Sequence, residues 1–179
     1  LYNEDPGELS ATLRKCCNNI AYLQDHKLPG YEGEDAWKNI LICIVSDGRT
    51  KAHPKTLQFL QQLGLFDEDA MTICSAGIDT RMHLFERTVI LNRLENRGIR
   101  SFFNSKTAKI PPLQIVFALK EHNAGKLDSH LWFYHGFARQ VQPEYTVLID
   151  VGTLPTKTSF YKLLASMEVD QKVGGVCGE

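Results

Sequence analysis

The sequence contains no hydrophobic run long enough to form a helix that crosses a membrane. Its longest apolar stretches, residues 40–45 and 146–151, are much shorter than the about 20 residues that a spanning helix needs. The formal net charge is −1 over 179 residues, so no positive field points to nucleic acid, and we expect no nucleic-acid partner. Hydrophobic residues make up 43% and charged residues 23% of the chain, which is typical of one globular domain with a buried core.

Several motifs with well-defined chemistry are also absent. The five cysteines are odd in number and form no C-x-x-C pair, so neither a disulfide framework nor a zinc site is expected, and most should be small buried hydrophobic residues in a reducing compartment. There is no G-x-x-x-x-G-K-[ST] loop, no G-x-G-x-x-G and no G-x-S-x-G motif, which argues against the nucleotide-binding loops and the serine hydrolases that use them. The histidines show no spacing typical of a metal pair or a catalytic triad.

Local signals predict where the first two helices begin and end. Asp5 can cap a helix that has Pro6 at its first position, and Glu8 stands where a capping box needs it. Apolar residues then recur at helical spacing to about residue 24. Pro54 opens a second helix, and Gly64 ends it.

The remaining elements alternate between strands and helices. We expect strands at 37–45, 84–91, 114–119, 145–150 and 173–177, helices at 128–141 and 156–167, and an exposed loop at 92–112. The aromatic residues of the first of these helices, Trp132, Phe133, Tyr134 and Phe137, are expected in the core rather than as a cofactor platform. The alternation predicts an α/β fold with a mostly parallel sheet, in which ligands bind beyond the carboxyl ends of the strands.

Two aspartates follow predicted strands and should therefore face the same crevice. Asp150 could hold a hard divalent cation through its carboxylate oxygens, with Gly152 allowing a ligand to approach the backbone. An ordinary turn or helix cap explains Asp150 as well. Asp47, Gly48 and Arg49 could form a turn that binds a base or a phosphate, and the alternative is an ordinary Asp-Gly turn.

Two further clusters admit a functional and a structural interpretation. Lys120, Lys126 and His130 lie between a predicted strand and a predicted helix, where Lys126 and the helix N-terminus could neutralise a diphosphate. The alternative is a solvated loop. Tyr2 could offer its ring to a base and Glu4 its carboxylate to a ribose hydroxyl, or both could simply end a strand.

Taken in order, the motifs resemble those of fungal-type chitin synthases, processive members of glycosyltransferase family 2. The similar stretches are YNED at 2–5, ICIVSDGR at 42–49, HPKTLQFLQQLGLF at 53–66, ALKEHNAGKLDSHLWFYHGFAR at 118–139, LIDVGTLP at 148–155 and GGVCGE at 174–179. The chain departs from the family pattern at Ser46 (usually Ala), His122 (usually Lys), Asp128 (usually Asn) and Leu131 (usually Arg). Both ends of the chain lie inside motifs, so we expect a piece of a longer protein.

The resemblance implies a fold and an activity. It implies a GT-A-like (Rossmann-like) sheet flanked by helices and incomplete at both ends, with residues 1–179 as the N-terminal donor-binding part of a single catalytic domain. The implied reaction transfers N-acetylglucosamine from UDP-N-acetylglucosamine to a chitin oligomer, with β-1,4 linkage and inversion. The catalytic base and the acceptor motif are expected further along the protein, so the piece alone should not make chitin.

The resemblance also implies roles for single residues. Tyr2, Glu4 and Asp47 would contact the uridine, and Lys126 would lie near the diphosphate. Asp150 would hold Mg²⁺ or Mn²⁺ where related enzymes have D-x-D, although Gly152 stands in place of the second Asp. Gly175, Cys177 and Glu179 would border the sugar and the acceptor.

The resemblance further implies a plasma-membrane protein with several membrane helices and with this domain on the cytoplasmic face. A homodimer is one assembly that it allows. Two other hypotheses stay open. The first is a catalytically silent homologue that binds a nucleotide sugar and regulates a partner, and the second is an unrelated α/β nucleotide-binding module.

Overall fold

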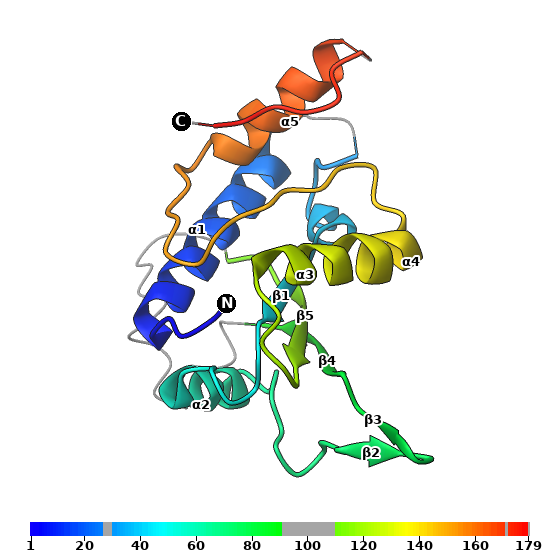
Figure 1. Ribbon diagram of the computed structural model, residues 1–179. Helices are drawn as coiled ribbons and strands as arrows, with labels where there is room; N and C mark the ends of the chain where they lie inside the picture. Colours follow the sequence, from blue (N-terminus) through cyan, green and yellow to red (C-terminus); the bar gives the residue numbers. More distant parts are fainter. Residues whose placement is uncertain (27–29, 91–109, 171, 179) are drawn as a thin grey trace.

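The computed structural model describes residues 1–26, 30–90, 110–170 and 172–178. Its main sheet has the strand order β1-β5-β4 (Figure 1). Strand β1 (Leu41–Ser46) runs parallel to β5 (Leu113–Lys120), and β4 (Met82–Val89) runs antiparallel to β5. The predicted α/β class is confirmed, and the sheet is mixed rather than mostly parallel.

The N-terminal residue extends this sheet at the free edge of β1. The amino nitrogen of Leu1 donates to the carbonyl oxygen of Val45 at 3.0 Å, and the N–H of Asp47 donates to the carbonyl oxygen of Leu1 at 2.9 Å. These two bonds are the pattern of a parallel pairing opposite Ser46. Residues 2–5 therefore leave the sheet beside the carboxyl end of β1.

Helix α1 (Pro6–Asp25) begins as the capping signals predict. One Asp5 carboxylate oxygen accepts from the N–H of Gly7 at 2.6 Å and of Glu8 at 3.1 Å, while Glu8 accepts from the N–H of Asp5 at 3.3 Å. Helix α2 (Pro54–Gln62) starts at Pro54, and Gly64 follows its end with a φ of +73°. Both predicted helices are confirmed.

Helix α1 packs along the molecule between the other helices. It contacts α2, the 3₁₀ helix η1 (Ala36–Asn39) and α5 (Ser159–Val169), and Figure 1 shows α2 and α5 at opposite ends of it. The main hydrophobic cluster joins α1, α2, β1 and β5, with Leu9, Ile20, Phe59, Leu60, Ile115 and Phe117 among its members. A smaller cluster joins Leu23 of α1 to Leu164 of α5.

One predicted strand is shorter than expected, and two other strand assignments are wrong. The strand predicted at 37–45 begins only at Leu41, because Trp37 belongs to η1. Residues 145–150 and 173–177 have no regular secondary structure, because no described segment pairs with them. The unassigned stretch 66–83 contains a short hairpin, β2 (Cys74–Ser75) and β3 (Ile78–Asp79). Most of the predicted loop 92–112 lies outside the described residues.

Two predictions of burial also differ from the structure. The helix predicted at 128–141 is present as α3 (Lys126–Leu131), a π-helical stretch η4 (Trp132–Ala138) and α4 (Arg139–Val141). None of its aromatic residues is buried: Trp132, Phe133 and Phe137 are half-buried and Tyr134 is exposed. All five cysteines are free, but only Cys16 and Cys17 are buried.

Candidate functional site

The candidate site is built around the turn that follows β1. Asp47 is the first residue after the strand and is only 9% exposed. Gly48 has a φ of +106°, and a Cβ placed there would lie 2.9 Å from the backbone nitrogen of Asn123. The turn therefore needs glycine both for its backbone conformation and for the close approach of the loop after β5.

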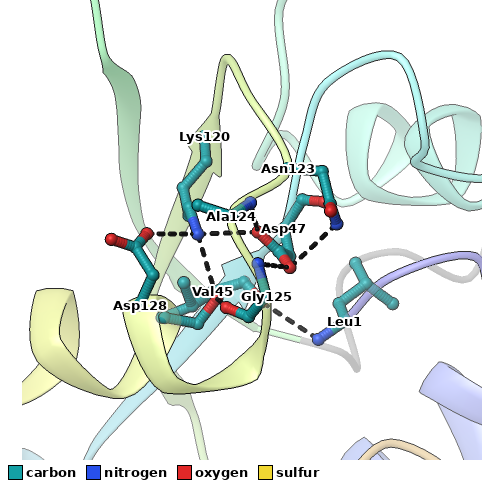
Figure 2. Close-up of polar contacts among 9 residues, drawn as sticks. Leu1, Val45, Asp47, Lys120, Asn123, Ala124, Gly125 and Asp128 are labelled. Carbon is teal, nitrogen blue, oxygen red and sulfur yellow. Dashed lines mark hydrogen bonds and ion pairs between the residues drawn. The ribbon is translucent and has the colours of Figure 1, made fainter.

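The Asp47 carboxylate is held by groups of that loop (Figure 2). One oxygen accepts from Lys120 Nζ at 2.6 Å and from the N–H of Ala124 at 3.0 Å. The other accepts from Asn123 Nδ2 and from the N–H of Gly125, both at 2.9 Å. Burial opposes ionisation, but the hydrogen bonds from Lys120 and the two amides outweigh it and lower the pKa of Asp47.

These bonds bear on the expected contact between Asp47 and uracil. Each carboxylate oxygen already accepts two hydrogen bonds, and a carboxylate has about four acceptor positions in all. The N–H of a base could bind Asp47 only by displacing one of these donors. The uracil contact stays a prediction. In this structure, Asp47 orders residues 120–125 through its hydrogen bonds.

Lys120 ends β5 and carries a buried charge. Its Nζ also contacts a carboxylate oxygen of Asp128 at 2.5 Å, and the lysine side chain is 3% exposed. Burial disfavours its ammonium group, but the hydrogen bonds that it donates to Asp128 and Asp47 raise the pKa of Lys120. Asp128 thus ties the first turn of α3 to the sheet.

Lys126 and Asp150 form an ion pair at the outer side of this network. Lys126 Nζ donates to Asp150 Oδ2 at 2.8 Å, although their side chains are 64% and 71% exposed. The hydrogen bond from Lys126 lowers the pKa of Asp150. Because the preceding residue, Gly125, binds Asp47, the structure brings Asp47, Lys126 and Asp150 into one continuous set of contacts.

Arg49 is engaged by a residue that the sequence analysis did not single out. Its Nε donates to both carboxylate oxygens of Glu121, at 3.1 and 3.0 Å. His83 Nε2 lies 2.5 Å from one of these oxygens. Burial opposes the charge on Glu121, but contacts with His83 and Arg49 lower the pKa of that carboxyl group. This group of three fixes the end of the Asp47 turn against β4 and β5.

Tyr2 and Glu4 lie next to the same turn. Leu1, which binds the backbone of Asp47, directly precedes Tyr2. The side chain of Tyr2 is exposed, and the backbone N–H of Tyr2 donates to Glu4 Oε2 at 2.5 Å. The Glu4 carbonyl oxygen accepts from the buried hydroxyl of Thr56 at 2.7 Å, so α2 holds this segment in place.

The other predicted site residues are less closely joined. His130 is half-buried and lies one helical turn after Lys126, on the same side of α3. Gly175 and Cys177 are exposed in the segment after α5. Among the described residues, no hydrogen bond or ion pair connects them to Lys126 or Asp150. Glu179 lies outside the described residues.

Asp150 is the residue that could hold a metal ion. The described part of the chain contains no group of three or more His, Cys, Asp or Glu side chains suited to a metal. A single carboxylate nevertheless fits Mg²⁺ or Mn²⁺ when the rest of the shell is water and the oxygens of a diphosphate. Lys126 occupies only one Asp150 oxygen, so the other faces no hydrogen-bond donor among the described residues.

The segment after Asp150 is fastened by two residues that the sequence analysis missed. Thr12 and Asn19 of α1 form hydrogen bonds with the backbone of residues 152–160. Both side chains are buried. The available signal was a polar residue at a helix position that otherwise faces the core, which is compatible with many roles.

Sequence comparison shows which glycosyltransferase family this α/β domain belongs to. Residues 1–179 match the chitin synthase-like glycosyltransferase domain. The chain belongs to this family, and its domain is of the chitin synthase catalytic type.

The similar proteins are chitin synthases of oomycetes and fungi. The chain is 48% identical to chitin synthase 1 of Phytophthora sojae, 36% to chitin synthase C of Aspergillus oryzae and 37% to chitin synthase 2 of Cryptococcus neoformans var. grubii. Each alignment covers 100% of this chain but only 18–19% of the relative. The chain thus spans about a fifth of the length of the relatives that it matches. Within the described residues, no helix is both long and apolar enough to cross a membrane.

Proposed function

We propose that the protein containing this chain is a chitin synthase. It transfers N-acetylglucosamine from UDP-N-acetylglucosamine to a growing chitin chain, with β-1,4 linkage and inversion at the anomeric carbon. Residues 1–179 are the donor-binding part of its catalytic domain. The observation that carries the proposal is the 2.8 Å pair between Lys126 and Asp150 beside the Asp47 turn, in a chain of the chitin synthase-like family.

Lys126 and Asp150 bind the diphosphate in this proposal. Lys126 uses one N–H on Asp150 and has others for phosphate oxygens. Asp150 stays ionised at neutral pH, since its pKa is lowered by Lys126, and its second oxygen would hold Mg²⁺ or Mn²⁺. The cation, when bound, supplies positive charge that stabilises UDP as it leaves. Lys126 adds charge stabilisation at the same group.

The nucleoside and sugar sides follow from the neighbouring residues. The exposed ring of Tyr2 offers a stacking face for uracil, and Glu4 lies beside it. Asp47, Gly48 and Arg49 form the turn that orders the loop ahead of Lys126, and His130 lies one turn further along the helix. We assign Gly175, Cys177 and Glu179 to the sugar and acceptor side, where the chitin oligomer binds.

The expected location is the plasma membrane, with this domain on the cytoplasmic face, where nucleotide sugars are made. Sealed vesicles of known orientation test this assignment. UDP-N-acetylglucosamine should support polymer formation only when it has access to the cytoplasmic face. Equal activity from the opposite face would contradict the assignment.

The activity is tested on the full-length protein with radiolabelled UDP-N-acetylglucosamine. We expect an insoluble product that chitinase degrades. Lys126→Ala and Asp150→Asn should each lower the rate by about 100-fold or more, because each removes charge stabilisation of the leaving group. Lys162→Ala on α5 and Asp79→Asn on β3 change exposed residues of the same types and should leave the rate within about twofold.

The same assay separates the proposal from its alternative. A full-length protein that binds UDP-N-acetylglucosamine but forms no polymer would favour the silent regulatory homologue. A protein that binds UDP no better than other nucleotides would favour an unrelated nucleotide-binding module.

A further inference from the structure

The segment that carries Asp150 needs an anchor outside the sheet. Residues 145–150 have no regular secondary structure, pair with no described strand and are mostly exposed. The ion pair with Lys126 is exposed on both sides, and exposed pairs contribute little to holding a side chain in place. Before Asp150, Tyr145 packs against Leu23 and Leu164 and donates to Glu168. The contacts nearest to Asp150 that could set its position come from the residues that follow it.

Those residues form a tight turn. The N–H of Thr153 donates to the carbonyl oxygen of Asp150 at 3.0 Å, and Gly152 has a φ of +93°. A positive φ at the third residue of such a turn is typical of type II. Asp150 is thus the first residue of a β-turn, and whatever fixes this turn also fixes the direction of its carboxylate.

Thr12 of α1 holds the turn in place through two hydrogen bonds. Its hydroxyl donates to the carbonyl oxygen of Thr153 at 3.1 Å and accepts from the N–H of Gly152 at 3.0 Å. The side chain is 6% exposed. One hydroxyl therefore binds the backbone of two successive residues of the turn, a geometry that specifies both the position and the orientation of the turn.

Asn19 holds the segment again further along. It lies two turns after Thr12 and so faces the same side of α1. Its Nδ2 donates to the carbonyl oxygen of Thr156 at 2.8 Å, and its Oδ1 accepts from the N–H of Phe160 at 2.9 Å. Asn19 is 1% exposed, so the start of α5 is docked on α1 through a buried amide.

The hydrogen bonds of Thr12 and Asn19 specify how the segment lies on α1, which apolar packing alone would not do. Thr12 and Asn19 bind partners about 140 residues away along the chain, on a helix whose neighbouring positions Leu9, Leu13 and Ile20 belong to the hydrophobic core. Apolar residues at positions 12 and 19 would also pack there, whereas buried polar groups are costly unless they are paired. Their polarity selects one alignment of residues 150–160 on α1.

We propose that Thr12 and Asn19 are positioning residues that set Asp150 at the right distance from Lys126 to hold the cation and the diphosphate. The inference rests on the proposed function of Asp150. Neither residue touches the donor. They act through the backbone of the turn, as groups outside the coordination shell of a metal orient its ligands.

The experiment compares full-length variants by their use of Mn²⁺. Thr12→Val keeps the shape of the side chain and removes both hydrogen bonds, whereas Thr12→Ser keeps the hydroxyl. We expect Thr12→Val to raise the half-activating Mn²⁺ concentration by about tenfold, and Thr12→Ser to stay within about twofold of wild type. The same order should appear in UDP-dependent Mn²⁺ binding, which electron paramagnetic resonance measures without turnover.

Ser10→Ala is the matched control. Ser10 is a buried hydroxyl residue on the same helix, and its Oγ donates only to the carbonyl oxygen of Gly7. This variant loses a local hydrogen bond without touching the turn, so both Mn²⁺ readouts should match wild type. A general loss of helix stability would shift Ser10→Ala and Thr12→Val alike and would overturn the inference.

Asp150→Asn separates this inference from the proposed function. If Asp150→Asn binds Mn²⁺ and UDP like wild type, the proposed metal role itself fails. If Asp150→Asn loses Mn²⁺ binding while Thr12→Val keeps it, or if Thr12→Ser fails to restore it, only the positioning role fails.

A measurement on the wild-type protein covers the case in which Thr12→Val does not fold. The amides of Gly152 and Phe160 should exchange with deuterium slowly, because both donate to buried side chains of α1. Exchange as fast as that of the exposed segment 145–149 would overturn the inference.

Discussion

The carboxylate of Asp47 keeps its charge in an almost enclosed position because four donors surround it. Its pKa is lowered from an ordinary value of 3.8. A carboxyl group with a lowered pKa in the folded protein stabilises the fold above its unfolded pKa, and that contribution is lost as the pH falls through the folded pKa. The pH window for Asp47 therefore lies below about pH 4.

The titration of Asp47 gives a prediction about melting temperature. Wild-type protein should melt higher than Asp47→Asn by a constant margin between about pH 7 and 5, and the margin should shrink below about pH 4. Comparing the two proteins cancels the titration of Glu121 and Asp150, which both retain. Thermal unfolding followed by tryptophan fluorescence measures the margin, with the exposed substitution Asp79→Asn as control. A margin that grows as the pH falls would contradict the prediction.

Ser46 shows the opposite situation, a buried hydroxyl without a partner. It is 0% exposed, and its Oγ has no hydrogen-bond partner among the described residues. Ser46→Ala should leave stability unchanged or raise it by about 1 kcal/mol, since it removes a polar group that burial penalises. Thr56→Val should instead cost about 1 kcal/mol, because the Thr56 hydroxyl donates to the Glu4 carbonyl oxygen. Melting temperatures that change in the same direction for both variants would refute this contrast.

Sequence motifs identified some site residues and missed others for a physical reason. Lys126 and Asp150 stand in stretches whose residue types suggest chemistry by themselves. Thr12, Asn19 and Glu121 have meaning only through partners about 70 to 140 residues away, and no local pattern encodes such partners. The candidates for direct contact with the donor were therefore predictable, and the residues that orient them were not.

At the scale of whole elements, helices were predicted better than strands. The beginnings of α1 and α2 depend on caps and prolines within a few residues, so local sequence specifies them. The apolar run at 145–150 has the composition of a strand, but a strand also needs an edge to pair with, and none is offered in the described sheet. The same non-local dependence explains why the parallel partner of β1 could be assigned only from the structure.

The Asp47 turn and the loop after β5 act as one unit, and Gly48 tests this. Alanine at Gly48 or at Gly77 of the β2–β3 hairpin must adopt a positive φ, which costs about 1 kcal/mol. Only at Gly48 does the added Cβ also meet a backbone nitrogen, that of Asn123. Gly48→Ala should therefore destabilise its surroundings by at least about 2 kcal/mol.

Hydrogen–deuterium exchange measures that difference locally. Gly48→Ala should speed exchange of the Ala124 and Gly125 amides, which donate to Asp47. Gly77→Ala, where no atom lies within 4 Å of the added Cβ, should leave these amides unchanged. Equal exchange in both variants would show that the turn and the loop are not coupled.

Across the whole molecule, α1 joins the core to the site. Its apolar side belongs to both hydrophobic clusters, through residues such as Leu13 in the first and Leu23 in the second. Its buried polar residues Thr12 and Asn19 hold the segment after Asp150. The distant motifs therefore meet at one site because of how α1 packs. Substitutions that disturb the packing of α1 should also change the position of Asp150.

The opposite feature is a set of exposed apolar side chains between residues 126 and 154. Its members are Leu127, Leu131, Tyr134, Val141, Val147, Leu148 and Leu154. Apolar side chains that gather on a surface mark contacts with further protein, and the relatives are about five times as long as this chain. We predict that residues 1–179 produced alone self-associate and bind a hydrophobic dye, whereas the full-length protein covers these side chains.

Paired substitutions test this prediction in both contexts. Leu131→Gln and Leu148→Gln should lower dye binding and self-association of the isolated residues 1–179, because they reduce the exposed apolar area. In the full-length protein the same changes should lower the melting temperature, because each places a polar amide in a buried contact at a cost of about 1 to 3 kcal/mol. Gln140→Ala, an exposed polar position on the same helix, should do neither. A full-length protein that tolerates both leucine substitutions with an unchanged melting temperature would mean that this surface faces solvent there too.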